Sequence, residues 1–251
     1  MDIGTYAAAS SGVLQMRKLE VQNNNLANIN TVGFKGQYVV SGPQSFDETL
    51  AGTIQSQDAF ARADRLRVPN VTEARTQIDF SQGPIQPTGN PLDVAIRGEK
   101  DFFVIDAPQG PLYTKAGNFT LNQNGELVTQ DGYRVQGDGG PIIIQGGSPF
   151  IGTDGTVRVA GIPVGRIQVA RFEDTSRLVA TEAARFKSNG PQPLIVDGRM
   201  EPQALEMSNV SAVTGMVDLI ATNRAFEAYT KAAQSLDGLN QTAINQVGKR
   251  Q

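Results

Sequence analysis

The sequence predicts an α+β protein whose N- and C-terminal helices pair as a coiled coil, with an antiparallel β-rich domain inserted between them. Apolar residues recur at helical spacing near both ends, whereas residues 37–202 combine frequent Gly and Pro with short β-prone runs. We therefore expect a helical domain formed by residues 1–35 and 211–251. We expect extended linkers at 36–84 and 186–210, and a β-rich central domain at 85–185.

The first predicted element is a helix that runs from about Tyr6 to Ile29. This segment has no Pro and a single Gly, Gly12, and Gly33-Phe34 closes it as a helix-ending signal. The side chains expected on its apolar stripe are Tyr6, Ala9, Val13, Met16, Leu19, Asn23 and Leu26.

The central segment is predicted to be built of short antiparallel strands joined by tight turns. Asn-Gly and Asp-Gly pairs suit turns that need a positive φ, and they occur at Asn124-Gly125, Asp131-Gly132, Asp154-Gly155, Asn189-Gly190 and Asp197-Gly198. The β-prone runs among them are residues 102–105, 125–129, 142–144 and 165–170. Helical segments do not alternate with these runs, so the pattern favours an antiparallel sheet over a parallel one.

The last predicted element is a helix from about Ser211 almost to the end of the chain. Its apolar positions form two rows at coiled-coil spacing. The rows are Leu219, Phe226, Ala233, Asn240 and Val247, and Thr222, Tyr229, Leu236 and Ala243. Both terminal stripes are thin, so either the protein's own sheet or neighbouring copies could cover them.

Composition excludes several classes of function. The chain has 251 residues, 22 basic and 25 acidic side chains, and no Cys, His or Trp. A nucleic-acid-binding surface needs concentrated basic charge, and catalysis or metal binding would lack the most common ligands and bases. No apolar run spans a membrane, and Met1–Thr5 does not resemble a cleaved secretion signal. We predict no cofactor, metal or catalytic residue.

An Asn-rich segment ends the first helix. Asn23, Asn24, Asn25, Asn28 and Asn30 each cost roughly 0.6 kcal/mol of helix propensity relative to Ala, or about 3 kcal/mol together. Asn24, Asn25 and Asn28 share one helix face, where their amides could fix the register of a helix–helix contact. The alternative is that these residues only cap the last turn.

Three blocks of sequence, in order, resemble the axial proteins of the bacterial flagellum, the rod and hook family. The short central domain and the run Val135–Ile142 most resemble a proximal-rod member, with a distal-rod member as the alternative. The blocks are Asn24–Lys35, then Pro91–Gly98 with Phe102–Val104, Tyr113–Asn122 and Gly125–Tyr133, then Glu206–Val210 with Met216–Tyr229.

The resemblance implies a structural subunit that polymerises helically through its terminal helices, transmits torque and forms the wall of an export channel. It implies other copies and other rod proteins as partners, together with the flagellar export apparatus. It also implies a periplasmic rod in the basal body, reached without a cleaved signal. The positions expected at the assembly interface are Asn24, Asn25, Leu26, Ala27, Asn28, Gly33, Phe34, Leu219, Asn223, Phe226, Tyr229 and Leu236.

Two alternatives come from other functional classes. Asp131, Asp138 and Asp154 could supply the paired carboxylates of a glycoside hydrolase, but each stands beside Gly in a turn pattern. A secreted β-rich adhesin or carbohydrate-binding module would not need coiled-coil stripes at both ends.

Overall fold

The protein is described by a computed structural model that covers residues 3–44, 71–182 and 184–248. The chain forms two units, and each is described here by itself. Unit 1 contains residues 1–24, 37–77 and 213–251, and unit 2 contains residues 25–36 and 78–212. These boundaries differ from the sequence-based ones. The segment expected as a linker at 36–84 contains two strands, Gln37–Gln44 and Val71–Ile78, that pair with each other. The segment expected as a linker at 186–210 contains strands that pair inside unit 2.

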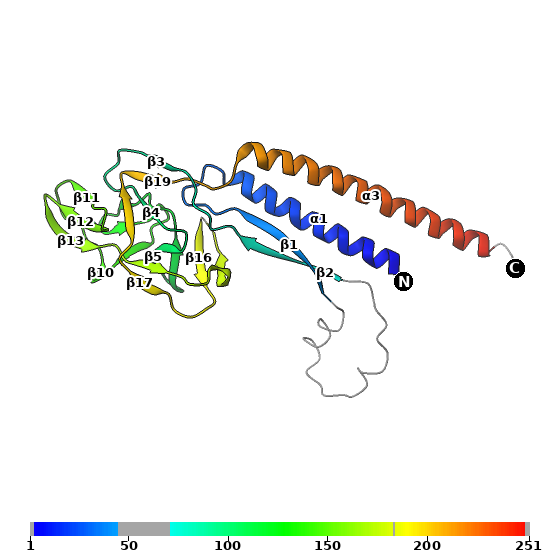
Figure 1. The fold of residues 1–251 in the computed structure, drawn as a ribbon, viewed down its shortest axis with the longest axis horizontal. Helices are drawn as coiled ribbons and strands as arrows, with labels where there is room; N and C mark the ends of the chain where they lie inside the picture. Colours follow the sequence, from blue (N-terminus) through cyan, green and yellow to red (C-terminus); the bar gives the residue numbers. More distant parts are fainter. Residues whose placement is uncertain (1–2, 45–70, 183, 249–251) are drawn as a thin grey trace, which may run out of the picture. The chain divides into compact units, whose positions relative to one another are not determined.

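Unit 1 contains two long helices and a two-stranded ribbon (Figure 1). Helix α1 spans Ile3–Ala27 and helix α3 spans Ala212–Gly248, so both predicted terminal helices are confirmed. Strands β1 (Gln37–Gln44) and β2 (Val71–Ile78) form the ribbon. Within the described part of the chain, no helix is both long and apolar enough to cross a membrane.

Unit 2 is an antiparallel β body. Its main sheet follows the order β15-β16-β6-β5-β9-β8-β7, with β14 pairing both β5 and β17, and with β10 pairing β9. A three-stranded sheet, β11-β12-β13, and two pairs, β18-β4 and β19-β3, complete it. The strands are β3 Ile85–Pro87, β4 Val94–Arg97, β5 Asp101–Ala107, β6 Gly110–Thr114, β7 Thr120–Leu121, β8 Leu127–Val128, β9 Arg134–Gly137, β10 Gly140–Pro141, β11 Pro149–Ile151, β12 Thr156–Val159, β13 Ile162–Arg166, β14 Val169–Arg171, β15 Leu178–Ala180, β16 Arg185–Ser188, β17 Leu194–Val196, β18 Arg199–Pro202 and β19 Ala204–Glu206, with a short 3-10 turn, η2, at Thr175–Arg177.

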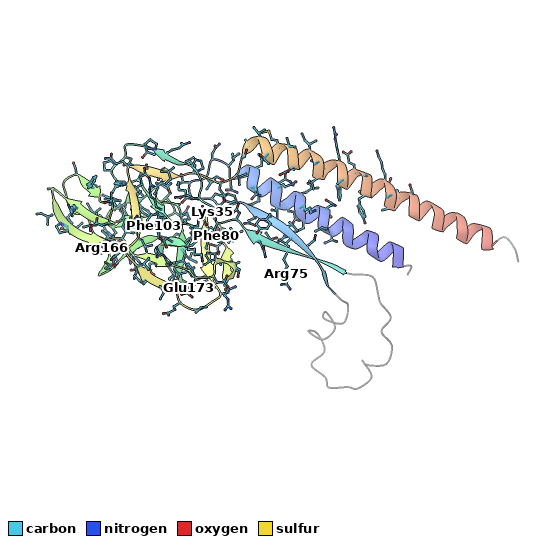
Figure 2. The ribbon with its side chains drawn as sticks, in the orientation of Figure 1. Lys35, Arg75, Phe80, Phe103, Arg166 and Glu173 are labelled. Atoms are coloured by element: carbon cyan, nitrogen blue, oxygen red, sulfur yellow. The ribbon has the colours of Figure 1, made fainter. Side chains whose placement is uncertain are left out.

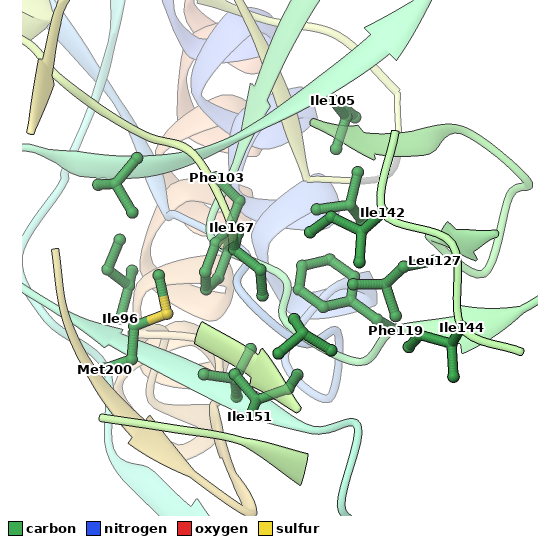
Figure 3. Close-up of a cluster of buried hydrophobic side chains, with 14 residues drawn as sticks. Ile96, Phe103, Ile105, Phe119, Leu127, Ile142, Ile144, Ile151, Ile167 and Met200 are labelled. Carbon is green, nitrogen blue, oxygen red and sulfur yellow. The ribbon is translucent and has the colours of Figure 1, made fainter. Parts of the chain in front are cut away.

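Strand β5 lies between two hydrophobic clusters because successive side chains of a strand point to opposite faces. Phe103 and Ile105 join the larger cluster, shown in Figure 3, whereas Phe102 and Val104 join a smaller aromatic one. The aromatic cluster consists of Phe80, Phe102, Val104, Tyr113, Ala170, Phe172, Leu178 and Phe186. Phe80 packs edge-on against Phe102 with ring centroids 5.4 Å apart, a favourable geometry for aromatic pairs.

The predicted turns and strands are confirmed in part. The glycines after Asn124, Asp131 and Asp154 have positive φ, as the turns require. Residues 142–144 form only an isolated bridge, although Leu127 N–H donates to Ile142 O at 2.9 Å. The run 165–170 is divided between β13 and β14, because the chain leaves one sheet and enters another near Ile167.

Candidate assembly site

A buried ion pair inside unit 2 joins the first and the last of the sequence blocks described above. It connects Lys35, the last residue of Asn24–Lys35, with Glu206, the first residue of Glu206–Val210. Lys35 follows the segment after α1 (labelled in Figure 2), and Glu206 ends β19. Lys35 Nζ donates to Glu206 Oε1 at 2.6 Å, and both side chains are fully buried. Lys35 Nζ also donates to Ser81 O at 2.6 Å, and Gly83 N–H donates to Glu206 Oε1 at 2.9 Å. We call Gly33, Lys35, Ser81, Gly83, Glu206 and Asn209 the terminal hub.

Asn209 supplies the second set of contacts in the terminal hub. Its Oδ1 accepts from Gly36 N–H at 2.7 Å, and its Nδ2 donates to Asp79 O at 2.9 Å. Asn209 Nδ2 also lies within hydrogen-bonding distance of both Ser81 O and Ser81 Oγ. One side chain therefore ties the segment before β1 to the segment that connects β2 with β3.

Gly33 and Phe34 are buried inside unit 2. Gly33 has φ +67°, and a Cβ there would lie 2.3 Å from Ala116 N. Its N–H donates to Glu206 O at 2.7 Å, so the tight approach is held by the terminal hub. Phe34 is 7% exposed. Both residues were predicted at the assembly interface, and both are buried by the fold of unit 2.

Lys115 is a second buried cation beside the terminal hub. Burial lowers its pKa from the usual 10.5 to about 8, while the charge of Glu206 raises the pKa and that of Lys35 lowers it. Lys115 Nζ donates to Gly98 O and lies 4.7 Å from the centroid of the Phe102 ring. The ammonium is therefore held in place, but its charged form is disfavoured in the folded state.

The free energy of unfolding is expected to rise with pH between about 8 and 10.5. In that window the unfolded chain binds more protons at Lys115 than the folded chain does, because the folded pKa is about 8 and the ordinary value is 10.5. Over the whole window the gain approaches about 3 kcal/mol, of which about 2 kcal/mol falls between pH 7.5 and pH 9.5. Urea unfolding at these two pH values measures that part, and Lys115→Met should remove most of the rise. An equal rise in the variant would contradict the assignment to Lys115.

The Asn-rich segment extends past the end of helix α1 into a turn. Helix α1 stops at Ala27, and Asn28 opens a turn in which Thr31 N–H donates to Asn28 O and Thr31 Oγ1 donates to Asn28 Oδ1, each at 3.1 Å. Asn24 and Ala27 are exposed, and Asn25, Leu26 and Asn28 are half-buried. At Asn28 these two hydrogen bonds support the alternative interpretation, in which the residue caps the last turn.

Helix α3 carries a covered row at alternating steps of three and four residues. Its less exposed side chains between residues 212 and 235 are Ala212, Gly215, Leu219, Thr222, Phe226, Tyr229 and Ala233, with Thr230 beside them. Thr222 is 9% exposed, and the rings of Phe226 and Tyr229 lie with centroids 6.5 Å apart. The predicted Leu219, Phe226 and Tyr229 belong to this row, Asn223 is exposed, and the side chain of Leu236 lies outside the described residues.

Helix α1 carries a matching covered row, which agrees with the predicted stripe at Leu19 and Leu26 but not elsewhere among the described side chains. From Gly12 onward the row is Gly12, Gln15, Leu19, Gln22 and Leu26, and a second row is Leu14, Lys18, Val21 and Asn25. Val13 and Met16 are 65% and 52% exposed, and Asn23 is also exposed, so their placement on the covered stripe was wrong. The side chains of Tyr6 and Ala9 lie outside the described residues.

A separate apolar row on α3 faces away from the covered one. Val213, Met216, Val217 and Ile220 are 75%, 52%, 59% and 55% exposed. Their spacing of three and four residues places them on one helix face. Clustered exposed apolar side chains of this kind mark interaction surfaces.

The acidic residues considered for catalysis either make local or ion-pair contacts or lie exposed in a turn. Asp131 pairs with Arg185 at 2.9 Å. The Thr156 hydroxyl donates to Asp154 at 2.7 Å and lowers the pKa of that carboxyl. A glycosidase acid needs a raised pKa. Asp138 is exposed in the turn between β9 and β10.

Comparison with known proteins gives three family matches along the chain. Residues 6–35 match the flagella basal body rod protein model, residues 95–159 the flagellar hook protein FlgE/F/G D1 domain, and residues 201–246 the flagellar basal body rod FlgEFG protein C-terminal model. The matches include both ends of the terminal hub, at Lys35 and Glu206.

Individual relatives match over almost the whole chain. The flagellar basal-body rod protein FlgF of Caulobacter vibrioides is 33% identical over 99% of both chains, and that of Mesorhizobium japonicum is 31% identical over 100% of both. The flagellar basal-body rod protein FlgG of Caulobacter vibrioides is 34% identical over 93% of this chain and 95% of the relative.

Proposed function

This chain belongs to the flagellar basal-body rod protein family, and from that premise we propose that it is a structural subunit of the proximal rod. The observation that carries the proposal is full-length similarity, with relatives named FlgF covering 99% or 100% of this chain and those named FlgG covering 90% to 96%. The family is structural and is not an enzyme family. The distal rod is the alternative position, because the FlgG relatives are equally similar where they align.

We propose that α1 and α3 pair as a coiled coil within the helical domain. The alternating covered positions on both helices support this, since steps of three and four residues are the spacing of a coiled-coil seam. Leu219, Phe226 and Tyr229 lie in that seam, and Leu236 would continue it. Two Gln side chains and one Thr make the seam weak, so polymerisation should supply further burial.

The assembly interface is proposed on the faces that the seam leaves open. On α3 this is the exposed row that begins at Val213, and on α1 it is Val13 and Met16. The exposed Asn24, Ala27 and Asn223 can then meet neighbouring copies, together with the half-buried Asn25, Leu26 and Asn28. Gly33 and Phe34 contribute by fixing the segment that follows α1, because they are already buried.

In this account the subunit lies in the periplasmic rod with other copies and other rod proteins. It transmits torque and lines the export channel, and it reaches its place through the flagellar export apparatus without a cleaved signal. A strain of the source bacterium without its proximal-rod gene should swim again when this chain is supplied, and a strain without its distal-rod gene should not. The reverse result would move the chain to the distal rod.

Changing Val217 to Asp is expected to abolish swimming, because it places a charge in the exposed apolar row of α3, where Val217 is 59% exposed. The measurement is the diameter of the swimming halo, with the amount of the subunit in isolated basal bodies. Ile162→Asp is the matched control, since Ile162 is 68% exposed on β13 in unit 2. Normal incorporation of the Val217→Asp variant would contradict this interface.

A further inference from the structure

Gly12 is an unusual residue for its position in α1. It lies within the helix and is buried, and Gly is much less favourable than Ala in a helix interior. Its φ is not in the left-handed region, so backbone conformation does not call for Gly. The requirement must come from space beside the helix.

The space beside Gly12 is filled by Tyr229 of α3. A Cβ at Gly12 would lie 2.5 Å from Tyr229 Cε1, 2.6 Å from Cζ and 2.8 Å from Oη. Real side chains do not approach this closely, so the end of the phenol ring occupies the volume that any larger residue at position 12 would need. Both residues belong to unit 1 and to the covered rows of their helices.

The contact also aligns the rest of the two rows. Figure 1 shows α1 and α3 running in opposite directions. Moving forward along α1 from Gly12 by three, four and three residues reaches Gln15, Leu19 and Gln22. Moving backward along α3 from Tyr229 by the same steps reaches Phe226, Thr222 and Leu219, which are all covered. If α1 were shifted along α3 by three or four residues, Gly12 would no longer lie opposite Tyr229.

We propose that Gly12 is a notch that receives Tyr229 and thereby selects the register and rotation of α1 against α3. The proposal rests on the proposed function, in which these helices pair in the rod. In this register small residues face large ones, because Gly12 lies against Tyr229 and the same steps along the two helices place Thr222 opposite Leu19. The selected rotation leaves Val13 and Met16 outward, where a neighbouring copy can contact them.

Cysteine cross-linking tests the register directly, because the natural chain contains no Cys. Four substitutions are used: Gln15→Cys, Gln22→Cys, Leu219→Cys and Phe226→Cys. In the proposed register 15 pairs with 226 and 22 pairs with 219. The crossed pairs, 15 with 219 and 22 with 226, use the same four positions but are displaced by seven residues, or about 10 Å.

Each double-cysteine chain replaces the natural one in the source bacterium, and isolated basal bodies are treated with a short bismaleimide. The proposed pairs should give at least fivefold more intrachain cross-link than the crossed pairs. Equal or greater cross-linking of the crossed pairs would overturn the register. Absence of the unaltered chain from basal bodies would instead contradict the proposed function, so the two failures are distinguishable.

Size exchange tests the notch itself. Gly12→Val should reduce the swimming halo at least threefold, and adding Tyr229→Ala should restore at least half of the loss. Gly238→Ala in α3 is the matched control, because a Cβ there meets nothing within 4 Å, and its halo should equal that of the unaltered chain. A normal halo for Gly12→Val, or no recovery in the double variant, would overturn the role of Tyr229.

Discussion

Replacing Glu206 with Ala is expected to lower the free energy of unfolding of unit 2 by about 3 to 5 kcal/mol. The substitution leaves the Lys35 ammonium buried, with its side chain fully inaccessible, and removes the carboxylate that pairs with it. It also removes the acceptor of Gly83 N–H. Urea unfolding followed by near-ultraviolet circular dichroism of the buried aromatic cluster measures the change, because that cluster lies in unit 2.

The matched control is an exposed ion pair in the same β body. Arg97 donates to Glu201 at 2.8 Å, with side chains 63% and 37% exposed. Glu201→Gln should therefore cost no more than about 1 kcal/mol. Lys35→Met combined with Glu206→Leu should recover much of the loss caused by Glu206→Ala, since no buried charge is then left unpaired. A loss at Glu206 no larger than that at Glu201 would contradict a structural role for the terminal hub.

The contacts of the terminal hub could not be predicted from the sequence. Lys35 and Glu206 stand in the two blocks that resemble flagellar axial proteins, yet Lys and Glu are seldom fully buried, and these two are 171 residues apart. Periodicity describes one segment at a time and does not report a contact across such a separation. The two helices and the antiparallel body were predictable, because each follows from local spacing and turn residues.

The covered face of α1 was predicted only at Leu19 and Leu26, for a related reason. The spacing of apolar residues predicted Val13 and Met16 on the covered face, although both are exposed. It did not include Gln15 and Gln22, which lie in the covered row. The methylene groups of a Gln side chain can pack along a helix–helix seam, so a polar residue type does not exclude a covered position. The only local signal for the true face was Gly12, whose helix-disfavouring character calls for an explanation in packing.

Replacing Gly33 with Ala is expected to lower the free energy of unfolding by about 2 to 5 kcal/mol, through two additive causes. The residue has φ +67°, which an L side chain adopts at a cost. The new Cβ would also lie 2.3 Å from Ala116 N and 2.5 Å from Lys115 C, both backbone atoms. Backbone cannot swing aside as a flexible side chain can, and the Gly33 N–H is held by Glu206 O. Urea unfolding of the full chain measures the loss.

Gly89→Ala separates the two causes. Gly89 has a similar φ of +75°, but a Cβ there meets nothing within 4 Å. It should therefore show only the conformational cost, about 1 to 2 kcal/mol. The additional loss of unfolding free energy at Gly33, relative to that at Gly89, measures the close approach of the segment after α1 to the segment after β6. Equal losses at the two glycines would mean that the Gly33-Phe34 motif is required for its turn alone, and that its packing against Ala116 adds nothing to the stability of unit 2.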